Sequence, residues 1–206
     1  MWALVEDNTI TKIINQPRGM VIGDTQYSRN IFSFRWSNAE REAIGLYEIV
    51  FDNSKKKEEE YYINTNQTFT YDADAGTVTA TYGNATARAH ADANATDADG
   101  NDLDPVIVIE GLKTKKIRNV KIQASSILTQ TDWYIVRKAD AGTAVPSAIT
   151  THRAAVRTKA AEMETAITNA ADTPALETLY TSVNTADEGD PVVMERPLGE
   201  LPTLES

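Results

Sequence analysis

Short apolar runs separated by turn residues fill the first 87 positions of the chain, and this pattern is typical of β-strands. The runs predict strands at residues 2–5, 10–14, 20–22, 31–34 and 46–51. Three polar residues, Glu6, Asp7 and Asn8, separate the first two runs and are suited to a tight turn. We therefore expect the chain to open with a β-hairpin.

One short helix interrupts this series of strands. Ser37 can cap a helix over residues 38–44, because Glu40 stands three residues later, as in a capping box, and Gly45 follows the helix. Further along, apolar and polar side chains alternate over residues 60–71 and 77–82, on either side of a turn-forming segment. These two segments predict a second hairpin.

The pattern changes after these strands. Residues 88–106 contain almost no large apolar side chain, so burial cannot offset the entropy lost when this acidic stretch is ordered. A strand at 106–109 is followed by apolar residues at helical spacing, which predict helices over 112–131 and 147–169. Residues 140–142, which end in a glycine, would join them into an antiparallel hairpin.

We therefore predict an α+β protein made of four segments. These are a β-rich domain with one short helix at 1–87, an acidic linker at 88–106, a helical hairpin at 107–171, and a short helix with an extended acidic tail at 172–206. From residue 160 onward there are ten acidic residues and a single basic one, Arg196. Such a tail is either a solvated surface or a docking segment for a basic neighbour.

The composition narrows the classes of function. With 206 residues, 41% hydrophobic and 24% charged, the chain matches ordinary folded proteins. A net charge of −10 disfavours nucleic acid as a partner, and the lack of cysteine excludes disulfides and thiolate chemistry. The sequence has neither a secretory signal pattern nor an apolar run of about 18 residues, which a membrane span requires. We expect synthesis in the cytoplasm and no membrane partner.

Candidate catalytic and metal-binding residues are sparse. The sequence has no nucleophile elbow, phosphate-binding glycine loop or His-Glu-x-x-His motif, and His90 and His152 lie far apart. Residues 97–104 resemble a calcium loop around Gly100, but Ala95 and Val106 occupy the first and twelfth positions, where acidic residues are needed. We expect no enzymatic activity, no cofactor, no metal and no small-molecule substrate.

Four residues of the predicted helical hairpin favour an architectural role over a ligand site. Arg153 and Arg157 stand one turn apart on the second long helix, and Asp132 and Trp133 lie at the expected end of the first. Ion pairing with the carboxylate and stacking on the indole would close the hairpin.

Two segments resemble proteins of bacteriophage tails. Residues 131–139, with Val145-Pro146 and residues 151–157, are similar to the signature Ser/Thr-Asp-Trp … Pro … Tyr/His-Arg-x-x-Val/Leu-Arg at the carboxyl end of tail-fibre assembly and tail-associated proteins. The usual tyrosine of that signature is His152 here. Residues 36–48 are similar to a Trp-Ser/Thr-x-x-Glu-x-x-x-Ile/Leu-Gly-Ile/Leu-Tyr segment near the amino end of marine phage tail proteins.

The resemblance implies a non-enzymatic protein of the virion tail or tail-fibre attachment region that binds other tail or fibre proteins, as a homo-oligomer or in a symmetric assembly. It assigns partner-binding or architectural roles to Trp36, Tyr47, Asp132, Trp133, Arg153 and Arg157. One alternative is a tail-fibre assembly chaperone that does not stay in the particle. Another is a carbohydrate-binding module using Tyr61, Tyr62 and Tyr71, which are interpreted more simply as packing residues of strands.

Overall fold

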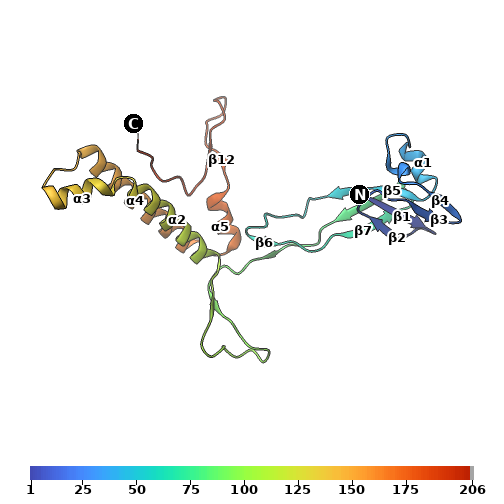
Figure 1. Cartoon of the computed structure of the whole chain (residues 1–206), viewed down its shortest axis with the longest axis horizontal. Helices are drawn as coiled ribbons and strands as arrows, with labels where there is room; N and C mark the ends of the chain where they lie inside the picture. The colour runs from blue at the N-terminus through green and yellow to red at the C-terminus, as the bar shows by residue number, and fades with distance from the viewer. Residues whose placement is uncertain (205–206) are drawn as a thin grey trace. The chain divides into compact units, whose positions relative to one another are not determined.

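A computed structural model describes residues 1–204 of the chain. The chain divides into two compact units, Met1–Thr86 and Ala87–Ser206. Figure 1 shows the longer strands in the first unit and the longer helices in the second. The expected α+β composition, with a β-rich amino-terminal region, is therefore confirmed.

A five-stranded sheet forms the centre of the first unit. Its strands are β1 (Trp2–Glu6), β2 (Thr9–Ile14), β5 (Leu46–Asp52), β7 (Thr68–Asp72) and β8 (Thr77–Thr81), in the order β2-β1-β5-β8-β7. Strands β5 and β8 are parallel, and the other neighbouring strands are antiparallel. Strands β2 and β7 stand at opposite ends of this order and still contact each other, so the sheet curls.

Both hairpins expected from the sequence contribute to this sheet. Strands β1 and β2 are joined through Asp7 and Asn8, which have φ angles of 51° and 60°, the backbone that tight hairpin turns require. Strands β7 and β8 form the second hairpin. The single strand expected over residues 60–71 is wrong, because β6 (Tyr62–Ile63) is separate from β7 and pairs with β9 (Thr86–Ala87).

The sheet has a buried cluster on each face, because successive residues of β1 point to opposite sides. Ala3 and Val5 pack with residues of β5 and β8 on one side, while Leu4 packs on the other. The second side is covered by β3 (Met20–Ile22), β4 (Thr25–Tyr27) and the 3-10 helix η1 (Arg29–Phe32), together with the residues Trp36 and Ile44 that flank helix α1 (Asn38–Glu42). Both faces of β1 are thus removed from solvent.

The capping box of α1 is confirmed. The Ser37 side chain accepts a hydrogen bond from the Glu40 backbone, and the Glu40 carboxylate accepts one from the Ser37 backbone at 2.7 Å. Gly45 follows with a φ of 77°, and a Cβ there would lie 2.4 Å from the Val5 carbonyl oxygen. Glycine is therefore required where this turn meets β1.

The strand expected at residues 31–34 is wrong, because Ile31 and Phe32 lie in η1 and the next two residues lie in the turn that follows it. The Ser28 side chain caps the turn by accepting from the Asn30 backbone, and Ile31 is the buried residue of the turn. The buried Arg41 then donates to the Ile31 and Ser33 carbonyls at 2.8 Å each. A local cap and a remote guanidinium satisfy the backbone groups that a strand would have paired with a neighbouring strand.

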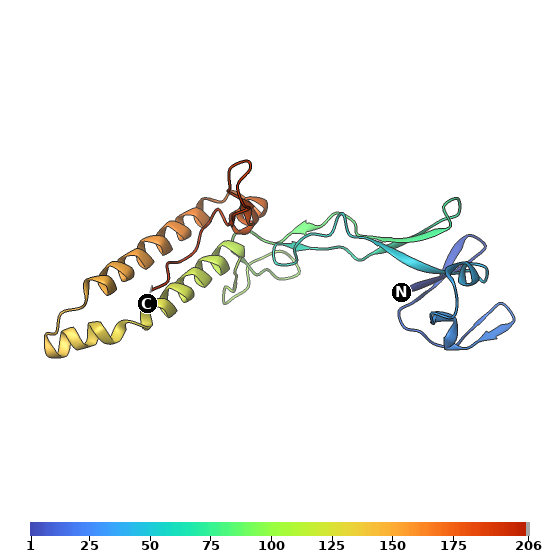
Figure 2. The same ribbon diagram turned by 90° about the horizontal axis from the view of Figure 1, so that it is seen from above.

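Four helices form most of the second unit: α2 (Leu112–Thr129), α3 (Asp132–Ala141), α4 (Ser147–Asn169) and α5 (Thr173–Tyr180). Helices α2 and α4 lie side by side (Figure 2). They run antiparallel, because Lys113 near the start of α2 donates to the Thr168 carbonyl near the end of α4. The predicted helix over 112–131 is too long: α2 ends at Thr129, and the separate helix α3 was not expected.

Two short hairpins extend from the same unit. Residues 88–106, expected to be a linker, lie within the second unit and supply β10 (Ala93–Asn94), which pairs with β11 (Val108–Ile109). The segment expected to be an extended tail contains β12 (Val183–Asn184) and β13 (Met194–Glu195), which also pair. Within residues 1–204, no helix is long and apolar enough to cross a membrane.

Candidate protein-interaction surface

The junction between α2 and α3 is organised by Arg153 of α4. This side chain is buried, and its Nη1 atom donates to the Leu128 carbonyl at 2.6 Å and to the Thr131 Oγ1 atom at 2.7 Å. Leu128 lies in the last turn of α2, where carbonyl groups lack partners within the helix. Arg153 therefore caps α2 and places a positive charge at its carboxyl end.

The same guanidinium group also anchors the beginning of α3. Its Nη2 atom lies 2.8 Å from the Asp132 carboxylate, which is half exposed and stands in the first turn of α3. The predicted ion pairing of Arg153 with Asp132 is thus confirmed. One side chain of α4 fixes the end of one helix and the start of the next.

Helix α3 presents Trp133 and its aliphatic side chains to solvent, while Tyr134 is partly buried. None of its ten residues is buried. Trp133 is 51% exposed and Val136 is 65% exposed. The ring centroids of Trp133 and Tyr134 are 3.7 Å apart, and the Arg137 guanidinium lies 4.7 Å from the Trp133 ring. A helix this short has little stability of its own, so a surface of this kind is suited to being covered by a partner.

The expected stacking partner of Trp133 is wrong. Arg137, one turn further along α3, lies over the indole, whereas Arg153 is bound to the α2–α3 junction. Arg157 is exposed on α4, and the structure shows no ion pair for it within residues 1–204. Trp133 lies in the first turn of α3 and not at the end of α2, where the prediction had placed it.

The two candidate residues of the first unit lie in different clusters. Trp36 is half buried on the α1 side of the sheet, edge-on to Tyr27 at a centroid distance of 6.0 Å. Tyr47 packs on the opposite face, where its hydroxyl is 3.1 Å from that of Tyr71. This hydrogen bond, followed by burial, raises the pKa of Tyr47 to about 12. The sheet therefore separates Trp36 and Tyr47.

The tyrosines considered for sugar binding are packing residues. Tyr61 and Tyr62 are buried, and Tyr71 is half buried against Tyr47. None of the three presents an open aromatic face of the kind that stacks on a ligand.

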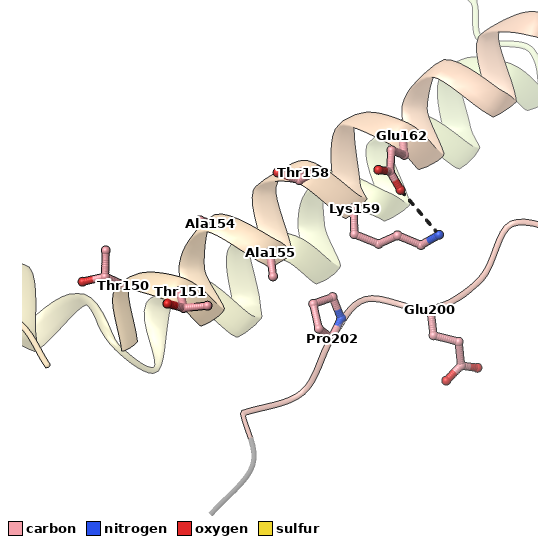
Figure 3. A pocket seen from close by; sticks show the side chains of 9 residues that line it. All are labelled: Thr150, Thr151, Ala154, Ala155, Thr158, Lys159, Glu162, Glu200 and Pro202. Atoms are coloured by element: carbon pink, nitrogen blue, oxygen red, sulfur yellow. Dashed lines mark ion pairs between the residues drawn. The ribbon is translucent and has the colours of Figure 1, made fainter. Parts of the chain in front are cut away.

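A shallow open groove runs between α4 and the chain segment after Leu198 (Figure 3). Its helical wall consists of short side chains such as Ala154, Ala155 and Thr158, and Pro202 faces them. Lys159 and Glu162 pair at 3.8 Å on its rim. The groove is open to solvent and lined mainly by short side chains. It therefore lacks the convergent polar groups that hold a small ligand.

Several structural residues were not predicted from the sequence. Arg41 and Lys116 are both buried despite their charge, and the Lys116 ammonium lies 3.9 Å from the centre of the Tyr180 ring. His90 contacts the Ala170 carbonyl with its Nε2 atom at 2.9 Å, at the end of α4. Helical spacing places Lys116, four residues before the buried Val120, on the inner face of α2.

Within the part of the chain that the structure describes, no cluster of three or more histidine and acidic side chains could hold a metal ion. The sequence matches no protein-family model, and no curated protein or solved structure is significantly similar to it.

Proposed function

We propose that this chain is a non-enzymatic structural protein of a bacteriophage tail or tail-fibre attachment region, which acts by binding other tail or fibre proteins in the virion. The observation that carries the proposal is the exposed face of α3. Its Trp133 side chain is half exposed beside the partly buried ring of Tyr134, and Arg153 fixes the helix that displays it. Rigid, exposed aromatic residues are the usual anchors of protein interfaces.

The resemblance to tail proteins supports the same conclusion. The segment that resembles the tail signature, residues 131–139, coincides with α3 and the residue before it. In this proposal Asp132 and Arg153 are positioning residues, Trp133 contacts the partner, and Trp36 and Tyr47 support the fold of the first unit. The acidic stretch after residue 181 is a second contact surface.

The test is quantitative mass spectrometry of gradient-purified phage particles that encode this chain. A copy number in a fixed small-integer ratio to the major tail proteins supports the proposal, since symmetric rings and fibres impose such ratios. Absence from particles, together with abundant protein in the infected-cell lysate, would refute it and favour the assembly chaperone.

A pair of variants connects this test to α3. Trp133→Ala removes the exposed indole and is expected to lower the copy number in particles, because an interface anchor is lost. Phe34→Ala is the matched control, since Phe34 is an aromatic residue of the first unit with 95% exposure. Equal copy numbers for both variants would exclude Trp133 as the anchor.

A further inference from the structure

The two hairpins of the second unit have the same sequence pattern. In the first, Asn94 precedes a turn that begins at Asp97, and Asp104-Pro105-Val106 leads into β11. In the second, Asn184, Asp187 and Asp190-Pro191-Val192 occupy the same places before β13. The turn of the second hairpin is shorter, but both turns contain a glycine with positive φ, Gly100 and Gly189.

Their backbone hydrogen bonds also correspond. Asn94 stands opposite Val108, and the Ala95 amide donates to the Ile107 carbonyl at 2.7 Å. In the second hairpin Asn184 stands opposite Met194, and the Thr185 amide donates to the Val193 carbonyl at 2.8 Å. The same structural element therefore occurs twice in this unit.

Both hairpins expose apolar strands. Each is a sheet of only two strands, so β11 and β13 each have a free edge. In each hairpin the segment that follows the turn, residues 106–109 or 192–194, carries apolar side chains that are at least 46% exposed. These are Val106, Ile107, Val108, Ile109, Val192, Val193 and Met194. A two-stranded hairpin is marginally stable alone, and free apolar edges readily accept another strand.

Charge identifies what can cover the first hairpin. The tip of the second hairpin carries Asp187, Glu188 and Asp190 and no basic residue. Helix α2, which begins three residues after β11, has five basic residues and no acidic one. Lys115 is exposed on it, and Arg118 pairs with Glu110 between β11 and the helix, so the base of the first hairpin keeps a net positive charge. The acidic tip of one copy is thus complementary to the base of the first hairpin in another.

The direction of pairing follows from the same charges. If β13 of one copy joined β11 of another in parallel, the two acidic tips would meet and repel each other. In the antiparallel arrangement, the acidic tip of the second hairpin lies beside the start of α2. At the other end Arg196 is already paired with Glu200, so that end adds no attraction. The separation of the two acidic tips and the basic residues of α2 therefore select antiparallel addition.

We infer that the second hairpin of one copy adds, antiparallel, to the free edge of β11 in a second copy of this chain, forming a four-stranded sheet between copies. Figure 1 shows the two hairpins extending to opposite sides of the unit. One copy can therefore donate its second hairpin and accept another at its first. Such head-to-tail contacts produce rings or open chains. This inference goes beyond the proposed function and does not depend on it.

The test uses matched lysine substitutions in the full chain. Val108→Lys blocks the accepting edge, and Met194→Lys blocks the donating one. The exposures of these side chains are 56% and 57%. Val21→Lys is the control, because Val21 is 57% exposed in the separate hairpin of β3 and β4. Circular dichroism verifies folding, and sedimentation equilibrium at up to about 100 μM measures association.

The expected result is association of the wild type and of Val21→Lys. Each blocking variant alone should associate at least about tenfold more weakly, because one large apolar contact is lost. A mixture of the two blocking variants should restore association but stop at dimers, because one intact donor and one intact acceptor remain.

Three outcomes would overturn the inference. The first is a monomeric wild type at these concentrations. The second is undiminished association of Met194→Lys alone, which would mean that the first hairpin pairs with itself. The third is a mixture of blocking variants that remains monomeric. Particle mass spectrometry is unaffected by any of these outcomes, so failure here and failure of the proposed function are distinguishable.

Discussion

Replacing Arg153 with methionine tests whether one guanidinium organises the α2–α3 junction. Methionine retains the apolar stem and removes all charged donors. Two hydrogen bonds are lost, to the Leu128 carbonyl and to the Thr131 hydroxyl, together with the ion pair to Asp132. Leu128 keeps its bonds from the Thr131 amide and hydroxyl, so its carbonyl is not left unpaired.

The magnitude follows from these contacts. A hydrogen bond from a charged donor contributes roughly 1.5–3 kcal/mol, and an ion pair with a half-exposed carboxylate contributes about 0–1 kcal/mol. With the remaining bonds to Leu128, we expect a loss of about 3 kcal/mol in the free energy of unfolding. Asp132→Asn should lower the free energy of unfolding by about 1 kcal/mol or less. Arg157→Met, the matched control on the same helix, should change it by no more than about 0.5 kcal/mol from the wild-type value.

Urea unfolding followed by circular dichroism at 222 nm is the assay, because the long helices all lie in the second unit. With a slope of about 2 kcal/mol per molar urea, Arg153→Met should lower the midpoint by about 1.5 M. Equal midpoints for Arg153→Met and Arg157→Met would refute the role assigned to Arg153.

Three further predictions concern other contacts. Gly45→Ala should lower the free energy of unfolding, measured by thermal unfolding, by about 3 kcal/mol or more, because the new Cβ would clash with the Val5 carbonyl. Gly76 has a similar φ of 62° but open space around it, so Gly76→Ala should lower that free energy by only about 1 kcal/mol. The raised pKa of Tyr47 means that its hydrogen bond stabilises the fold below about pH 10, and this stabilisation is lost as the pH rises through about 12. In an ultraviolet titration Tyr71→Phe should make Tyr47 ionise at a lower pH, and an unchanged titration would contradict the contact. Hydrogen bonds from the Gly111 amide and the Thr114 hydroxyl lower the pKa of Asp92. The stabilising effect of its carboxylate is therefore present above about pH 4 and is lost as the pH falls through the folded-state pKa. Asp92→Asn should make the free energy of unfolding depend less on pH in the acid range, and an unaltered acid range would count against this contact.

Short-range signals predicted many local elements correctly. Ser37 and Glu40 predicted the start of α1, and the spacing of apolar residues predicted the bounds of α4 at 147–169. These features depend on residues within one or two turns of each other. The separate helix α3 was missed, because the junction before it is held by Arg153, which is 22 residues beyond Thr131 in the sequence.

The repeated hairpins were missed for a different reason. Their shared Asp-Pro-Val triplet was visible in the sequence, but the surrounding acidic residues favoured a linker and a tail over a folded element. Only the pairing of Asn94 with Val108 and of Asn184 with Met194 reveals that the two segments are equivalent.

Local spacing and residue type were sufficient to predict the α+β composition, the first hairpin, the cap of α1 and the unequal distribution of charge. They did not specify which charged side chains are buried and which apolar ones remain exposed, because these depend on contacts between remote segments. Arg41 is buried because the Ile31 and Ser33 carbonyls of a preceding turn accept hydrogen bonds from it, and Trp133 is exposed because α3 packs none of its residues inside the unit. Burial depends on which remote groups meet, and local pattern does not specify that.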